Sequence, residues 1–168
     1  MNVDQTAVIG IDHVGFSCAD LDGALEFFCD VLGVPLRTRG ELVGGSAGEA
    51  VDHPELRGRY ADLDLGDGHT LELFEIAEPR GEPITPDALR PGGGHCALRV
   101  RDIDDLVARV IAAGYEPVAK TVQFDEPGFW SGARVVYVRG PGGIVIELIE
   151  RAADSSYSTA LTRSGPAG

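Results

Sequence analysis

Two histidines and two glutamates occupy matching places in a sequence that repeats itself. His13 begins the segment HVGF, and Glu72 lies in the later segment TLELFE. In the second copy His95 begins HCAL, and Glu147 lies in VIELIE. Imidazole nitrogen and carboxylate oxygen together suit Zn, Ni, Co, Mn or Fe, and two of each leave positions open on a six-coordinate ion. The repeat therefore predicts one divalent metal ion of the catalytic kind, which needs open positions so that water or substrate oxygens can bind.

Each of these side chains also has an ordinary structural interpretation. A single histidine in an apolar strand is more often structural than a ligand, but two at equivalent points of a repeat favour the ligand interpretation. Glu147 has apolar neighbours on both sides, where burial of an unpaired carboxylate costs free energy that a metal would offset. Glu75 and Glu150, three residues after the repeated glutamates, fall on the opposite strand face and are expected to be solvated strand ends.

The repeat also predicts the elements that position the four side chains. Each histidine begins an alternating strand whose residues two and four positions later are small or polar and share its face. Asp20 and Asp102 are suited to cap the amphipathic helices that follow, and Gly33 and Gly114 to end them. Three strand-like runs come after each helix: 35–42, 59–65 and 69–76 in the first copy, and 116–124, 133–140 and 144–150 in the second.

The order βαβββ therefore occurs twice, which predicts the α+β class. We expect a single domain over residues 1–168, made of one module at 10–77 and another at 94–151. Residues 78–93 are rich in Pro and Gly and are expected to link the modules. The small and polar residues 152–168 are expected to form a flexible tail.

Composition argues against several classes of partner. A formal net charge of −13 leaves no basic patch for nucleic acid and disfavours anionic membrane surfaces. No apolar run is long enough to span a membrane, and the N-terminus does not read as a signal peptide. The three cysteines lack CxxC spacing and are expected to be buried free thiols, which favours a cytoplasmic protein. A small-molecule substrate is the expected partner.

A duplicated βαβββ module, with a histidine on its first strand and an IEL-type glutamate on its last, resembles the vicinal oxygen chelate superfamily. This group includes glyoxalase I, methylmalonyl-CoA epimerase, extradiol dioxygenases, and the fosfomycin and bleomycin resistance proteins. The likeness covers about residues 10–151 and departs at Gly140-Pro141-Gly142-Gly143, where the family often has Asp-Pro-Asp-Gly. It implies a cup-shaped, eight-stranded mixed sheet with helices outside, a homodimer, and the four side chains His13, Glu72, His95 and Glu147 as metal ligands.

In this superfamily the metal acts as a Lewis acid on a chelating oxygen substrate, and a carboxylate moves a proton on the adjacent carbon. With glutamate at position 72, the ligand set resembles that of glyoxalase I and the epimerases. The sets of dioxygenases and fosfomycin-modifying enzymes are of the His-His-Glu type, with another residue at this position. The resemblance therefore predicts a metal-dependent lyase, isomerase or epimerase that forms an enolate-like intermediate of a small oxygenated metabolite. Glu147 is the first candidate for the base and Glu72 the second. A non-catalytic resistance protein and an extradiol-type dioxygenase are the alternatives.

Substrate-binding residues are less marked. Arg99 shares a face with His95 and is a candidate for binding a carboxylate, although a solvated arginine fits the sequence equally well. Phe129 and Trp130, in the loop DEPGFWSG, are candidates for a pocket wall, with ordinary loop packing as the alternative. The basic residues with which glyoxalase I binds glutathione have no identifiable equivalents in this sequence.

Overall fold

The computed structural model describes residues 8–152, and the chain divides into two compact units, Met1–Pro83 and Ile84–Gly168. Each unit contains one copy of the repeat. The expected tail at 152–168 lies outside the described residues except for Ala152. None of the helices within the described part of the chain is long and apolar enough to cross a membrane.

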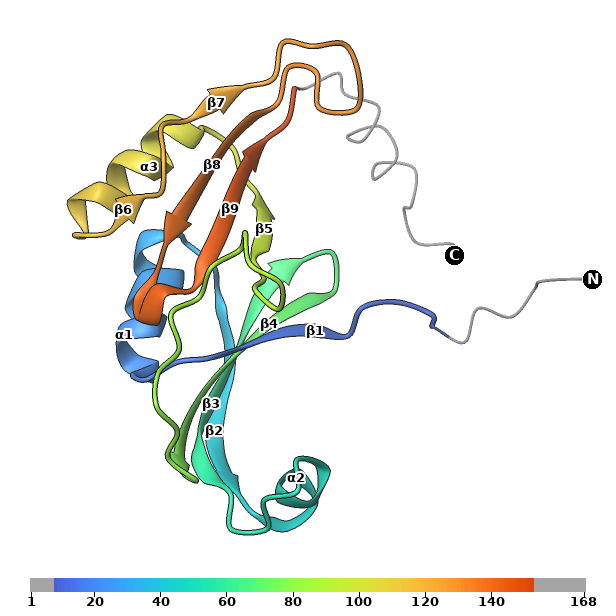
Figure 1. Ribbon diagram of the computed structural model, residues 1–168, viewed down its shortest axis with the longest axis vertical. Helices are drawn as coiled ribbons and strands as arrows, with labels where there is room; N and C mark the ends of the chain where they lie inside the picture. The colour runs from blue at the N-terminus through green and yellow to red at the C-terminus, as the bar shows by residue number, and fades with distance from the viewer. Residues whose placement is uncertain (1–7, 153–168) are drawn as a thin grey trace, which may run out of the picture. The chain divides into compact units, whose positions relative to one another are not determined.

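The first unit is built around a four-stranded mixed sheet in the order β1-β4-β3-β2 (Figure 1). β1 pairs in parallel with β4, and the β4–β3 and β3–β2 pairs are antiparallel. Its strands are β1 (His13–Ser17), β2 (Leu36–Val43), β3 (Arg57–Gly66) and β4 (His69–Glu78); its helices are α1 (Leu21–Leu25), the π-helix η1 (Glu26–Val31) and α2 (Gly45–Ala50).

The second unit contains a five-stranded mixed sheet in which β5-β9-β8-β6 follow one another and β7 also pairs with β8 (Figure 1). The strand β5 again pairs in parallel with the last strand, β9. Its elements are β5 (Cys96–Arg99), α3 (Ile103–Ala112), β6 (Glu116–Pro117), β7 (Val122–Gln123), β8 (Arg134–Arg139), the 3-10 helix η2 (Pro141–Gly143) and β9 (Val145–Glu150).

The tandem βαβββ order and the α+β class are confirmed, with two local differences. The run 116–124 forms the two short strands β6 and β7 instead of one, so the described strands number nine, in sheets of four and five. The first helix becomes a π-helix after Leu25. Its wider turn lets the adjacent side chains of Phe27 and Phe28 both be fully buried, with their rings 5.2 Å apart.

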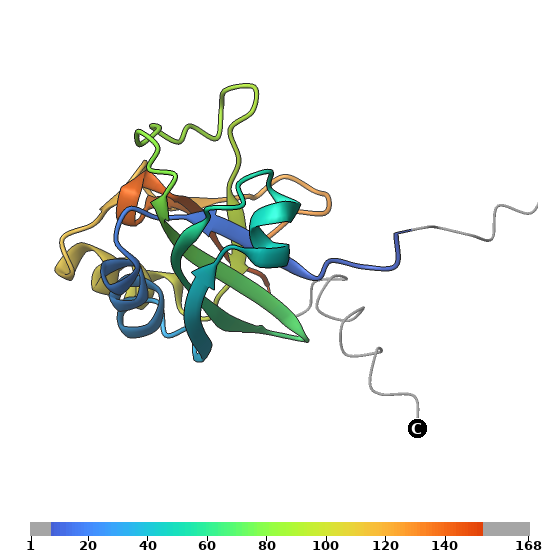
Figure 2. The ribbon, with the colours of Figure 1, turned by 90° about the horizontal axis from the view of Figure 1, so that it is seen from below.

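Each helix covers the apolar face of the sheet in its own unit, as the alternation predicts. α1 packs against β3 and β4, and α3 packs against β6 and β9 (Figures 1 and 2). The fully buried side chains include Leu63, Leu71 and Leu73 in the first unit and Val138, Ile146 and Leu148 in the second. Because side chains alternate along a strand, the opposite faces remain available to polar groups.

The predicted helix boundaries are confirmed by cap geometry. The Asp20 carboxylate accepts a hydrogen bond from the backbone N–H of Asp22, and Asp102 accepts one from Asp105. Gly33 and Gly114 have φ angles of 78° and 86°, the left-handed conformation that ends a helix and that glycine adopts without strain. The predicted cysteine state also agrees in part, since Cys18 and Cys96 are buried free thiols while Cys29 is half-buried.

Glu75 was expected to be a solvated strand end, and that expectation is wrong. Its carboxylate accepts a hydrogen bond from the Leu21 backbone N–H at 2.8 Å and pairs with Arg59 at 2.6 Å. Arg59 also pairs with Asp22 in the first turn of α1 at 2.9 Å. These contacts tie the N-terminus of α1 to the sheet on the face opposite Glu72, because three positions along a strand reverse the face.

The second unit repeats this arrangement, so the same expectation is wrong for Glu150. Glu150 accepts a hydrogen bond from the Asp102 backbone N–H at 2.8 Å and pairs with Arg134 at 3.1 Å. Arg134 pairs with Asp104 at 2.6 Å. The same carboxylate–arginine–carboxylate link is therefore present in both units. In each unit it orients the helix on the strand that carries the repeated glutamate.

We expect Glu75→Gln to lower the free energy of unfolding by about 1–2 kcal/mol at neutral pH, since two hydrogen bonds to a charged group are weakened. The Leu21 N–H and then Arg59 hold the pKa of Glu75 below its ordinary value of 4.5. A carboxyl group whose pKa is lowered in the folded state stabilises the fold above about pH 4.5. This stabilisation is lost as the pH falls through the folded-state pKa. The difference in urea unfolding between variant and wild type should therefore be smaller below about pH 4 than at neutral pH. The exposed Glu82→Gln is the control, and an equal difference at both pH values would contradict the assignment.

Candidate functional site

The first unit brings His13 and Glu72 together. β1 lies beside β4 with Gly15 opposite Glu72 (Figure 1), and His13 Nε2 lies 3.5 Å from Glu72 Oε2. A Cβ atom at Gly15 would make ordinary contacts with this pair, 3.6 Å from Glu72 Oε2 and 3.9 Å from the His13 ring, so the backbone of β1 runs directly beside the two side chains. Both side chains are partly exposed. The predicted pair is thus formed on the polar face of the sheet.

His13 is oriented by its neighbour Asp12. The imidazole Nδ1 lies 2.8 Å from Asp12 Oδ1, and this hydrogen bond is the largest cause that raises the pKa of His13; Glu72 and Asp62 add to it. Donation from Nδ1 to a carboxylate leaves Nε2, the atom that faces Glu72, as the lone-pair nitrogen. Histidine ligands of metals are commonly held in this way by a carboxylate on the other ring nitrogen.

The second unit brings His95 and Glu147 together at the equivalent place. His95 lies one residue before β5, not inside it, and its Nε2 is 3.1 Å from Glu147 Oε2. Ala97 stands opposite Glu147 across the β5–β9 pair, as Gly15 does opposite Glu72. Glu147 is buried, with 8% of its surface exposed. A carboxylate at that depth needs compensating partners, and His95 is one of them.

Tyr137 is the other partner of Glu147, and the sequence did not single it out. It stands opposite Glu147 in the β8–β9 ladder, and its ring packs edge-on against His95 at 5.2 Å. Burial, then the charge of Glu147 and a hydrogen bond to it, raise the pKa of the Tyr137 phenol. The corresponding position in the first unit is Asp62, opposite Glu72. Both residues precede their glutamate by ten positions, which is the signal in the sequence that could have found them.

The donor geometry in each unit is compatible with a metal ion. Metal–ligand bonds of about 2.1 Å place neighbouring ligand atoms about 3.0–3.4 Å apart for octahedral to tetrahedral angles. The N–O separations of 3.1 and 3.5 Å lie close to that range. Within residues 8–152 no cluster of three or more His, Cys, Asp or Glu side chains has the geometry of a metal site. Each unit therefore brings together one histidine and one glutamate, the pair that the sequence predicted.

The predicted substrate-binding residues form a separate group in the second unit. Phe129 and Trp130 lie in the loop between β7 and β8, with ring centroids 5.5 Å apart, and Trp130 also contacts Phe124 at 5.7 Å. The guanidinium of Arg151 stacks over Trp130 at 4.0 Å and over Phe129 at 4.5 Å. Arg151 follows Glu147 by four residues, about 13 Å along an extended chain. Both aromatic side chains remain partly exposed.

Arg99 lies at the end of β5 and is exposed, two residues after Ala97, so it shares the face of Glu147. Its register partner in β9 is Ile149. The structure therefore places Arg99 on the predicted face.

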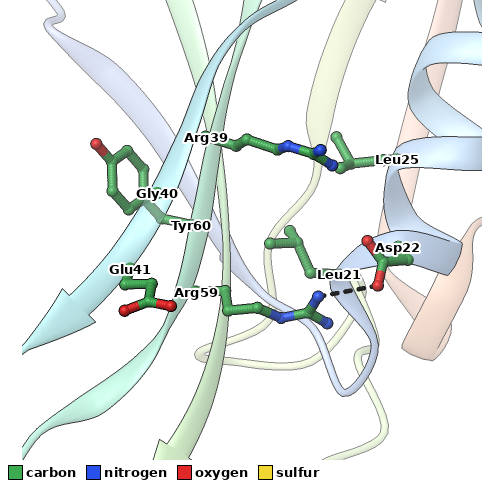
Figure 3. A pocket seen from close by; sticks show the side chains of 8 residues that line it. All are labelled: Leu21, Asp22, Leu25, Arg39, Gly40, Glu41, Arg59 and Tyr60. Carbon is green, nitrogen blue, oxygen red and sulfur yellow. Dashed lines mark hydrogen bonds and ion pairs between the residues drawn. The ribbon is translucent and has the colours of Figure 1, made fainter.

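A pocket of about 360 Å³ lies on the other face of the first sheet, between α1 and strands β2 and β3 (Figure 3). Arg39 and Arg59 extend from the strands toward α1, and Arg59 meets Asp22 there (Figure 3). Arg59 and Glu72 are on opposite faces, because Arg59 is three positions from Asp62, the residue paired with Glu72. This pocket is therefore distinct from the His13–Glu72 pair.

Comparison with known proteins agrees with this architecture. The model of the family described as Glyoxalase/Bleomycin resistance protein/Dioxygenase superfamily matches residues 10–148. The chain is 32% identical to a 2-epi-5-epi-valiolone epimerase of Actinomyces sp over 89% of this chain and 83% of that protein. It is 26% identical to a lactoylglutathione lyase of Arabidopsis thaliana over 83% of this chain and 43% of that protein.

A solved structure shows the same fold. The glyoxalase family protein of Bacillus cereus is 27% identical and superposes with a TM-score of 0.76, covering 90% of this chain and 98% of that one. The two curated relatives named above are an epimerase and a lyase, both enzymes. With the family model spanning both copies of the repeat, the chain belongs to the glyoxalase/bleomycin resistance protein/dioxygenase superfamily.

Proposed function

We propose that this protein is a metal-dependent epimerase that inverts a stereocentre next to a carbonyl group in a small oxygenated metabolite. The observation that carries the proposal is the duplicated pair, in which each unit directs the Nε2 atom of one histidine toward the carboxylate of one glutamate. The 32% identity to a 2-epi-5-epi-valiolone epimerase supports the epimerase class over the others in the superfamily.

In this proposal His13, Glu72, His95 and Glu147 supply the ligands of one divalent ion, Zn, Ni, Co, Mn or Fe. When bound, the ion stabilises as a Lewis acid the negative charge that develops on a substrate carbonyl oxygen. His13 is held for this role by Asp12, and Glu147 is held by His95 and Tyr137. The contacts of Glu75 and Glu150 with the helix N-termini lie on the opposite faces of the sheets, so they leave these polar faces free for a ligand.

The two glutamates suit proton transfer with inversion. Inversion requires a proton to leave one face of a carbon and another to return to the opposite face, so two acid–base groups are needed. Glu147 is the first candidate for the base that removes the proton, and Glu72 for the group that returns one. Glu147 is placed first because it is buried, with His95 and Tyr137 holding its carboxylate in position.

A lactoylglutathione lyase is the second candidate, since two curated relatives carry that name, at 26% and 28% identity. It uses the same transfer of a proton beside a carbonyl, and the glutamate at position 72 fits both activities. The two candidates differ in the substrate, which for the lyase carries the charges of glutathione.

The test is solvent exchange. The protein loaded with each ion in turn is incubated with 2-epi-5-epi-valiolone in D₂O and followed by proton NMR. The expected result is loss of one C–H signal, because deuterium replaces the transferred proton, together with the signals of a second epimer. Conversion of the hemithioacetal of methylglyoxal and glutathione would favour the lyase instead. Binding without exchange would favour a resistance-type binding protein, and oxygen uptake with Fe(II) the dioxygenase.

A further inference from the structure

The two units differ beside the repeated glutamates. In the second unit the residue opposite Glu147 is Tyr137, whose hydroxyl hydrogen bonds to Glu147 and whose ring packs on His95. In the first unit the residue opposite Glu72 is Asp62. The position that the protein fills with its own hydroxyl group in one unit is thus occupied by a hydrogen-bond acceptor in the other.

Asp62 is accessible from the face on which His13 and Glu72 meet. It is half-buried, and within residues 8–152 its side chain forms neither a hydrogen bond nor an ion pair, although its charge acts on His13. Asp64, on the same strand and face, is by contrast engaged: it pairs with Arg37 at 3.1 Å and accepts a hydrogen bond from the Gly66 backbone at 2.8 Å. Directly opposite residues of an antiparallel pair have Cβ atoms about 4.5–5.5 Å apart, so Asp62 lies within reach of anything bound at Glu72.

Asp62 does not complete a metal site with its neighbours. Within the described part of the chain, His13, Glu72 and Asp62 are not grouped as donors with the geometry of one ion. Two carboxylates directly opposite each other repel, and hydrogen-bond donors from a ligand would offset that repulsion. An anionic ligand would instead increase it, and the net charge of −13 acts in the same direction.

We infer that Asp62 is a specificity-determining residue that accepts a hydrogen bond from a substrate hydroxyl group, so that the substrate is an uncharged, hydroxyl-bearing carbonyl compound and not a glutathione or coenzyme A conjugate. This inference rests on the proposed function, because it takes the substrate to bind at the His13–Glu72 pair. It assigns the selection of the substrate to the position opposite the repeated glutamate, where one copy of the repeat has Asp62 and the other has Tyr137.

The experiment compares Asp62→Asn with Asp64→Asn, its matched control two residues along the same strand face. Binding of 2-epi-5-epi-valiolone is measured by calorimetry on the metal-loaded protein. Asp62→Asn should weaken it about 10–100-fold, because the charged acceptor is replaced by a neutral amide that also presents an N–H donor, whereas Asp64→Asn should change it by no more than about twofold. Asp62→Asn should also shift the preference toward the anionic hemithioacetal of methylglyoxal and glutathione, and should retain the metal content of the wild type.

Three results would overturn the inference: unchanged binding by Asp62→Asn, loss of metal from it, or wild-type protein that binds the hemithioacetal in preference to 2-epi-5-epi-valiolone. Thermal unfolding of the variants separates a loss of binding from a loss of folding. If Asp62→Asn is unfolded, binding is measured instead with Asp62→Glu, which keeps the charged acceptor and should bind with affinity close to that of the wild type. Wild-type binding without solvent exchange would refute the proposed epimerase and leave the role of Asp62 supported.

Discussion

Glu147→Gln is expected to lower kcat by about 10²–10⁴-fold, because glutamine keeps the shape of the side chain but its amide does not accept a proton. The metal content should remain measurable, since the amide oxygen and the other three ligands are retained. The effect should exceed that of most substitutions because Glu147 is only 8% exposed and is held by His95 and Tyr137, so bulk water has little access to take over its role.

The measurement is turnover of the substrate that the wild type converts, with metal content determined on the same samples by mass spectrometry. Glu150→Gln is the matched control. It lies three residues along β9, faces the other way and pairs with Arg134, so it should affect stability and leave kcat within about twofold. Turnover by Glu147→Gln at the wild-type rate would refute its role as the base.

His13→Ala and His95→Ala are each expected to weaken metal binding by at least about 100-fold, since loss of groups that only orient ligands already costs about 10–100-fold. The two substitutions lie in different units, yet each should remove the same ion, because two donors from one unit do not make a site. Wild-type protein should therefore hold one ion per pair of units, and calorimetric titration with Zn²⁺ or Ni²⁺ measures both affinity and stoichiometry.

His53 provides the control for these variants. It forms a similar contact, with its Nδ1 3.2 Å from Glu55 Oε1, but it lies in a loop outside the repeat. His53→Ala should leave metal binding unchanged. Two ions per chain in the wild type, or a loss confined to one of the two histidine variants, would refute the shared site.

A mixed dimer shows which chains supply the ligands. Co-expression of His13→Ala with His95→Ala, each with its own affinity tag, tests the expected homodimer, because purification on both tags in turn isolates only dimers that carry one copy of each variant. Where an ion takes one pair from each chain, one of the two sites in such a dimer is complete, and half of the metal binding returns. Where both pairs come from one chain, neither site is complete and no metal binding returns.

The local features of the chain could be predicted because they depend on near neighbours. The alternation of a strand placed His13 on the same face as Gly15, and the helix ends at Gly33 and Gly114 follow from the left-handed conformation that glycine adopts. The π-helix at Glu26–Val31 did not follow from the sequence, because apolar spacing alone does not distinguish it from a regular helix.

The contacts of Glu75 and Glu150 illustrate what local reasoning missed. Alternation placed them correctly on the face opposite Glu72 and Glu147, but it does not reveal that an arginine from the neighbouring strand and a helix N-terminus meet there. Those partners are separated from the glutamates by 16 residues for the arginines and by about 50 for the helix ends. Only the packed sheet and helix bring them within hydrogen-bonding distance.

The sequence by itself indicated the family, the four side chains that form the two His–Glu pairs and the strand faces on which they lie, because a repeat and a period of two residues are visible in one dimension. The tertiary structure decided which groups surround the donors. Asp62 stands opposite Glu72, and Tyr137 opposite Glu147, at the same spacing of ten residues although the two hairpins have different turns. A register shift between Asp64 and Gly66 contributes to that pairing, and register is a property of two strands hydrogen-bonded together.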